Sequence, residues 1–298
     1  MSIKISSLQK THSLNSFLNL TFSILIVVFV FICIVMNLLA DPTEIVEEVG
    51  TKTFRMFTVL SNMFVGVTFA MTIPFAVDGI RTRNYHLPRW IVTLTYASVI
   101  CVTLTFLVAL TILSPRAGFY EMMLEETNLF LHTIVPVMAI VSFLFVNSYH
   151  TIKFKTTFIA MAPMLAYAVT YLVMAILIGE ENGGWRDHYR FEELMPWYYI
   201  LILMLVLTFG IATALRVVHN AMHRRDKLAT ERYYHTAADY DLPTIEEAIR
   251  KIASESRSRD LGGEVTVPRR IIKILEKKYQ SGKSITDLCG IYLDEYLK

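Results

Sequence analysis

The stretch FLNLTFSILIVVFVFICIVMNLL, residues 17–39, decides the class of this protein. It contains no charged side chain, and it exceeds the roughly 20 apolar residues that an α-helix needs to cross the hydrocarbon core of a membrane. It is also longer than the apolar segment of a secretory signal peptide, which has at most about 15 residues. We therefore expect an uncleaved first transmembrane helix in this stretch.

Five similar stretches follow in the 298-residue chain, and none of them contains an acidic residue. They are residues 54–77, 90–113, 128–148, 157–178 and 196–218. Their only basic residues, Arg55 and Arg216, lie near the ends, where a long side chain can reach the membrane surface. Charged residues make up 18% of the whole chain, against about 25% in an average soluble domain. The sequence predicts an all-α, polytopic membrane protein with six transmembrane helices.

The charges of the connecting segments predict the orientation in the membrane, because cytoplasmic loops are rich in Lys and Arg. Basic residues collect before the first helix, in the second and fourth loops and after the sixth helix: Lys4, Lys10, Arg81, Arg83, Arg89, Lys153, Lys155, Arg224, Arg225 and Lys227. Acidic residues collect in the alternate loops: Asp41, Glu44, Glu47, Glu48, Glu121, Glu125, Glu126, Glu180, Glu181, Asp187, Glu192 and Glu193. We therefore expect both termini in the cytoplasm, and we place the protein in the cell (plasma) membrane.

The composition changes after Val218, which predicts a transmembrane domain at residues 1–218 and a cytoplasmic tail at residues 219–298. This tail is expected to be a small helical unit or partly disordered. A basic amphipathic helix is predicted at residues 268–279, and its cationic side chains could instead dock on anionic lipid: Arg269, Arg270, Lys273, Lys277 and Lys278. The net charge of +2 gives no reason to expect a nucleic-acid partner.

Polar side chains inside a membrane are costly, so they become functional candidates. His132 is the one histidine within a predicted span, and Asn128, four residues earlier, is expected to share its face, where it could orient the imidazole. Thr58, Ser61 and Asn62 have the i, i+3, i+4 spacing of a polar stripe on the second helix. Both helices enter the membrane from outside, and Thr58 and His132 each lie about four residues, or ~6 Å, inside the predicted boundary.

A hydroxyl group activated by histidine is the minimum equipment for nucleophilic acyl transfer. Each residue also has a structural interpretation, since buried threonine and histidine commonly join helices through hydrogen bonds. A second polar set, Tyr167, Thr170 and Tyr171, could contact a ligand or a neighbouring helix. The sequence contains no glycine-rich phosphate loop and no His/Cys cluster with the spacing of metal ligands, so we expect neither a cofactor nor a metal.

The segments FTVLSN (residues 57–62) and LHTIVP (residues 131–136) together resemble the androgen-induced-protein family of multi-helix membrane hydrolases and its bacterial relatives. Members have a threonine early in one helix and a His-Thr-x-x-Pro type sequence in a later one. The resemblance spans roughly residues 15–215 and implies Thr58 as nucleophile and His132 as its base. In animal members it implies hydrolysis of fatty-acid esters of hydroxy fatty acids. The Tyr-Pro that often follows the fifth helix in this family is missing from residues 185–191, which leaves the substrate open.

Two hypotheses follow. The first is an intramembrane esterase that acts on a lipid ester with Thr58 and His132, in which Ser61, Asn62 or Asn128 stabilises the oxyanion. The second is a non-enzymatic membrane scaffold or a carrier for a small solute or lipid. The spans show no buried charge pair and no inverted repeat of broken helices, which speaks against a carrier.

Overall fold

A computed structural model describes residues 2–40, 49–82, 87–146, 150–189 and 196–237. Within these ranges the chain forms helices and no β-strand, which confirms the all-α prediction. The long helices are α1 (Ser2–Leu39), α2 (Phe57–Thr82), α3 (Arg89–Val108), α9 (Ala162–Tyr171) and α10 (Trp197–Ala237). The shorter α-helices are α4 (Ser114–Ala117), α5 (Phe119–Met123), α6 (Glu126–Asn128), α7 (Val135–Val141) and α8 (Phe154–Ala160). Between them lie the 3₁₀-helices η1 (Gly50–Arg55) and η6 (Glu180–Asn182) and the π-helical turns η2 (Ala109–Leu113), η3 (Leu129–Ile134), η4 (Ser142–Val146) and η5 (Leu172–Ile178).

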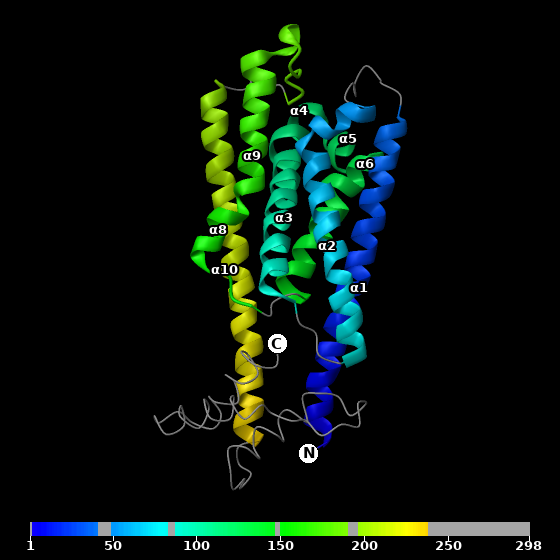
Figure 1. Cartoon of the computed structure of the whole chain (residues 1–298), viewed down its shortest axis with the longest axis vertical. Coiled ribbons are helices and arrows are strands. Elements are labelled where there is room, and N and C mark those ends of the chain that lie inside the picture. The colour runs from blue at the N-terminus through cyan, green and yellow to red at the C-terminus, as the bar shows by residue number, and fades with distance from the viewer. Residues whose placement is uncertain (1, 41–48, 83–86, 147–149, 190–195, 238–298) are drawn as a thin grey trace. The chain divides into compact units, whose positions relative to one another are not determined.

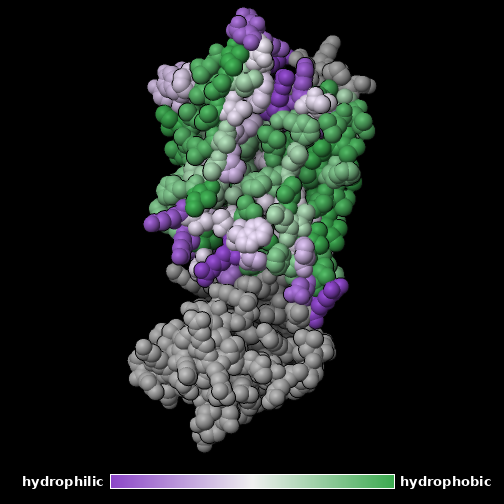
Figure 2. All heavy atoms as spheres, viewed as in Figure 1, coloured by the Kyte–Doolittle hydropathy of each residue, from purple (hydrophilic) through white to green (hydrophobic). Residues whose placement is uncertain are grey.

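In the described part of the chain, six helical segments are long and apolar enough to cross a membrane, as the sequence predicts, and the protein is an integral membrane protein. They are Leu14–Leu39, Phe57–Arg81, Arg89–Ala117, Glu126–Val146, Phe154–Ile178 and Trp197–Met222. Large apolar side chains point outward from them, for example Phe31, Ile159 and Val206, which are 67%, 65% and 64% exposed. Figure 2 shows apolar side chains over most of the visible face of these helices. Such a surface is suited to lipid rather than to water.

Residues Leu18–Pro74 and Leu87–Asn220 form one compact unit, and residues 1–17, 75–86 and 221–298 are grouped separately. The sixth helix does not end where the composition changes, because α10 continues without a break past Val218 to Ala237. The predicted tail from residue 238 onward lies outside the described residues. This includes the cationic side chains expected to contact anionic lipid: Arg269, Arg270, Lys273, Lys277 and Lys278.

Helix α3 forms the core of the compact unit, where it packs against α7, α8 and α9 (Figure 1). Its middle is buried throughout, from Thr95 to Thr105. Tyr96 is fully buried, and its hydroxyl donates a hydrogen bond to the carbonyl of Ala212 on α10, at 2.6 Å. The ring of Tyr96 stacks on Phe143 with 5.6 Å between centroids. This one side chain therefore joins three of the membrane-spanning segments.

Pairs of small hydroxyl side chains connect α2 to its neighbours. Ser61 contacts Thr105 of α3 at 2.9 Å, and Thr68 contacts Ser98 of α3 at 2.8 Å. Hydroxyl groups that bond across helices allow close packing in lipid, where no water competes for them. The buried face of α2 is thus polar at several levels, and Thr58 stands at the first of them.

Candidate functional site

The second membrane helix begins at Phe57, so the predicted start at residue 54 is wrong. Residues Gly50–Arg55 form the 3₁₀-helix η1, and Met56 is extended with φ −84° and ψ 130°. The first α-helical hydrogen bond runs from the amide of Leu60 to the carbonyl of Met56, at 3.2 Å. Thr58 therefore lies in the first turn of α2, not four residues inside it. Phe54, Met56 and Phe57 are all apolar, so residue type does not reveal this break.

Thr58 and His132 lie in direct contact. The Oγ1 atom of Thr58 is 3.2 Å from Nε2 of His132, and the two side chains are 7% and 5% exposed. The other ring nitrogen, Nδ1, is 2.7 Å from the carbonyl oxygen of Met122. Because a carbonyl only accepts hydrogen bonds, Nδ1 carries the proton, and Nε2 presents a lone pair to the hydroxyl of Thr58. This tautomer lets the threonine hydroxyl donate its proton to the imidazole.

A π-helical turn, η3, carries His132. The carbonyls of Met122 and Met123, at the end of the short helix α5, accept hydrogen bonds from His132 and from Thr133, the latter at 2.8 Å. The last carbonyls of a helix have no partner within the helix, so they are available for such contacts. Pro136 lacks an amide proton and cannot bond back to the carbonyl of residue 132, which favours irregular geometry at this point. The two bonds to α5 fix the imidazole in its orientation.

Asn128 does not orient the imidazole, contrary to the prediction. Its side-chain amide donates to the carbonyl of Glu121 at 2.9 Å, and the carbonyl of Met122 binds His132 instead. The i, i+4 spacing considers only residues of the same helix. The two side chains instead bind separate backbone carbonyls of α5, Asn128 that of Glu121 and His132 that of Met122.

Ser61 and Asn62 support the backbone around the pair. Asn62 donates from Nδ2 to the carbonyl of Thr58 at 2.8 Å and to that of Leu131 at 3.0 Å. Ser61 donates to the carbonyl of Thr58 at 3.0 Å. Asn62 thereby links the two segments that carry the threonine and the histidine. Its two amide protons are both engaged, so it has no donor left for an oxyanion.

Tyr189, in the loop after the fifth membrane-spanning segment, completes the site and was missed by the sequence analysis. Its hydroxyl oxygen accepts a hydrogen bond from the amide of Phe57 at 2.9 Å. It also interacts with the backbone and side chain of Thr58 and with the hydroxyl of Tyr167. Removal from water raises the pKa of Tyr189 above its ordinary value of 10, so the phenol keeps its proton. The only available signal in the sequence was an aromatic residue in a short loop between two predicted membrane spans, which is also typical of an interfacial belt.

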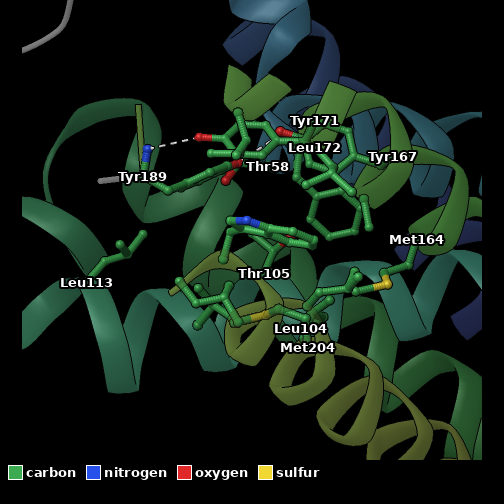
Figure 3. A pocket seen from close by; sticks show the side chains of 17 residues that line it. Thr58, Leu104, Thr105, Leu113, Met164, Tyr167, Tyr171, Leu172, Tyr189 and Met204 are labelled. Carbon is green, nitrogen blue, oxygen red and sulfur yellow. Dashed lines mark hydrogen bonds between the residues drawn. The ribbon is translucent and has the colours of Figure 1, made fainter. Parts of the chain in front are cut away.

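A cavity of about 110 Å³ opens beside Thr58. Its lining is almost wholly apolar or aromatic and comes from α2, α3, η2, α9, η5, α10 and the loop with Tyr189: Phe57, Thr58, Leu104, Thr105, Val108, Leu113, Met164, Tyr167, Ala168, Tyr171, Leu172, Ile176, Tyr189, Trp197, Ile200, Leu201 and Met204. Figure 3 shows Thr58 and Tyr189 on one side of the cavity, with Leu104 and Met204 on the opposite side. His132 is not part of the wall, so Thr58 stands between the imidazole and the cavity.

Of the second polar set, the structure brings Tyr167 and Tyr171 to the cavity but not Thr170. The hydroxyl of Tyr167 donates to the carbonyl of Arg55 at 2.8 Å, and that of Tyr171 donates to Asp187 at 2.5 Å. Thr170 is exposed and donates to the carbonyl of Ala166. The two tyrosines therefore tie the fifth segment to η1 and to the loop that carries Tyr189.

The ring of His188 lies next to that of Tyr189, with 4.4 Å between the centroids. The rings of His188 and Tyr171 are nearly perpendicular, with 5.1 Å between the centroids. Burial lowers the pKa of His188 from 6.5 to about 4, and the nearby Arg55 adds to this effect. The imidazole is therefore neutral at pH 7 and packs as an aromatic ring.

Among the described residues, no group of three or more His, Cys, Asp or Glu side chains could hold a metal ion. Comparison with protein-family models, with curated proteins and with solved structures finds no match to this chain. The resemblance to the androgen-induced-protein family therefore remains a hypothesis that rests on the two short segments around Thr58 and His132.

Proposed function

We propose that this integral membrane protein is an esterase that cleaves a fatty-acyl ester, with Thr58 as nucleophile and His132 as general base. One observation carries the proposal. A buried hydroxyl lies 3.2 Å from the unprotonated nitrogen of an imidazole whose other nitrogen is fixed by a carbonyl, and this hydroxyl lines an apolar cavity. Nucleophile, base and orienting group in series form the arrangement that hydrolases with a hydroxyl nucleophile use.

In the first half-reaction Oγ1 of Thr58 forms a bond to the ester carbonyl carbon while Nε2 of His132 takes the hydroxyl proton. The electron pair of the carbonyl moves to its oxygen. The intermediate then collapses, the bond to the alkoxy oxygen breaks, and His132 returns the proton to that oxygen. The products are an alcohol and an acyl-Thr58 ester.

In the second half-reaction water attacks the acyl-Thr58 carbonyl. His132 takes a proton from the water and returns it to Oγ1 of Thr58 as the acyl bond breaks. A carboxylic acid is released, and both residues regain their resting state.

The lining of the cavity supports an acyl chain as the group bound there. It contains no charged side chain, and it includes the flexible, apolar side chains of Met164 and Met204. An ester with its carbonyl at Thr58 would place hydrocarbon against this wall. The family resemblance points to the same class of substrate.

We also propose that both termini lie in the cytoplasm and that the protein resides in the plasma membrane. The support is the alternation of basic and acidic loops along the chain. Thr58 then faces the outer leaflet, from which a lipid ester can reach the cavity laterally.

The test is hydrolysis of a fluorogenic fatty-acyl ester by purified, detergent-solubilised protein. Thr58→Ala and His132→Ala are each expected to lower turnover by at least about 10³-fold, and the double variant by little more, because the two residues act as one unit. Thr103→Ala is the matched control. That threonine is also buried in a membrane helix, but it donates only to the carbonyl of Val99 in its own helix.

A structural role for Thr58 as a hydroxyl that joins helices, like Ser61 and Thr68, would give a different result. Thr58→Ala would then reduce the thermal stability but leave the turnover of the folded fraction unchanged. A wild-type protein with no hydrolysis of any acyl ester would favour the scaffold or carrier hypothesis.

A further inference from the structure

An acyl-transfer site needs hydrogen-bond donors for the oxyanion, and the residues expected from the sequence do not provide them. The two protons of Asn62 go to backbone carbonyls, and the hydroxyl of Ser61 is shared between the carbonyl of Thr58 and Thr105. Asn128 binds the carbonyl of Glu121. The donors must come from elsewhere around Thr58.

The first turn of α2 has donors that point toward the reacting hydroxyl. The amides of a helix start have no carbonyl partner within the helix. The amide of Phe57 donates to the hydroxyl oxygen of Tyr189 at 2.9 Å, and the backbone and side chain of Thr58 meet the same oxygen. One phenol oxygen thus lies in contact with both the nucleophile and the amides beside it.

We propose that Tyr189 stabilises the oxyanion, and that its hydroxyl is the donor. This inference rests on the proposed function and deepens it. As the bond from Oγ1 of Thr58 to the carbonyl carbon forms, negative charge develops on the carbonyl oxygen, and Tyr189 directs its O–H at that oxygen. The phenol proton stays on Tyr189 throughout, so no further co-reactant is needed.

The hydrogen bond that Tyr189 accepts from Phe57 makes its hydroxyl a better donor, since an acceptor oxygen becomes polarised and releases its own hydrogen more readily. Because the phenol remains protonated at neutral pH, the donor is present whenever the site is folded. A donor of this kind, set in an apolar cavity, acts where water is excluded and is worth more than in solution.

The outer loop holds Tyr189 in place through backbone contacts. The amide of Trp185 donates to the carbonyl of Met174 at 2.8 Å, and that of Gly184 donates to the carbonyl of Gly179 at 2.8 Å. The amide of Tyr189 lies 3.5 Å from the hydroxyl of Tyr171. The loop is thus bonded to the fifth membrane-spanning segment at Trp185, before the tyrosine, and at Tyr189 itself.

The experiment compares Tyr189→Phe with wild type for ester turnover and for the rate at which a long-chain fluorophosphonate labels Thr58. The substitution keeps the ring and removes the hydroxyl. We expect kcat and the labelling rate to fall by about 10²–10³-fold, with KM within about threefold, because an oxyanion donor acts mainly in the transition state. Tyr199→Phe, which removes a hydroxyl from an exposed tyrosine of α10, is the matched control and is expected to behave as wild type.

A second variant keeps the test valid if Tyr189→Phe does not fold. Replacement of Tyr189 by 3,5-difluorotyrosine retains ring and hydroxyl but lowers the pKa of the phenol. The alkaline limb of the pH–rate profile should move to lower pH, since a phenolate cannot donate a hydrogen bond. A residue that only caps α2 would leave this limb unchanged.

Unchanged kcat and labelling in a folded Tyr189→Phe protein would overturn the inference while the Thr58–His132 proposal stands. Faster turnover would also overturn it, since it would mean that the hydroxyl obstructs the site. If wild-type protein is neither labelled nor active, the proposed function itself fails. The two failures are therefore distinguishable.

Discussion

Gly184→Ala is predicted to lower esterase turnover without touching the cavity. A Cβ atom at this position would lie 2.2 Å from the carbonyl oxygen of Met174 and 2.8 Å from that of Gly179. Both neighbours are backbone atoms, so the loop itself must move. Ordinary van der Waals contact with the nearer oxygen needs about 3.4 Å. The loop with Tyr189, five residues along the chain, must therefore shift by roughly 1 Å.

A displacement of about 1 Å at a reacting group can cost about 10²-fold in rate. We expect Gly184→Ala to lower kcat by roughly 10- to 100-fold, measured by hydrolysis of the fluorogenic acyl ester. Gly210→Ala in α10 is the matched control, because a Cβ there meets nothing within 4 Å. Alanine is favoured over glycine inside a helix, so this control should be as stable as wild type or slightly more so. Wild-type turnover in Gly184→Ala would refute the argument that loop position sets the rate.

Two further predictions concern stability and topology. The free energy of unfolding should fall as the pH decreases from 6.5 to about 4, by at most about 3 kcal/mol, because unfolded His188 takes up a proton in this window and folded His188 does not. The variant His188→Phe should lose that part of the pH dependence of the melting temperature. An unchanged pH profile in the variant would show that His188 does not titrate in this way. Cysteines introduced at the exposed positions Glu125 and Glu181 should react with an impermeant maleimide in intact cells, and one at the exposed Lys155 should not. The reverse labelling pattern would show that the protein has the opposite orientation in the membrane.

The architecture could be predicted from the sequence because membrane-spanning helices carry a strong compositional signal. The run at residues 17–39 and its five counterparts all form helices of sufficient length. The break before Phe57 escaped prediction, since Phe54 and Met56 are as apolar as the residues of α2. What ends the 3₁₀-helix is the extended backbone of Met56, which composition does not reveal.

The candidate site could be predicted only where side chains alone define it. Thr58 and His132 stood out as polar residues in apolar segments, and the structure brings them together. The group that orients His132 is a backbone carbonyl, at Met122, and a backbone atom leaves no trace in residue type. Tyr189 contacts the amide of Phe57 across 132 positions of the chain, and no local pattern indicates that contact.

The central claim is that Thr58 is the nucleophile. Its most direct test is mass spectrometry of protein treated with a long-chain fluorophosphonate, followed by assignment of the modified residue. The account predicts a phosphonyl adduct on Thr58 in wild-type protein and none in a folded His132→Ala variant after the same time. An adduct on a different residue, or an equal rate of Thr58 labelling without His132, would contradict it.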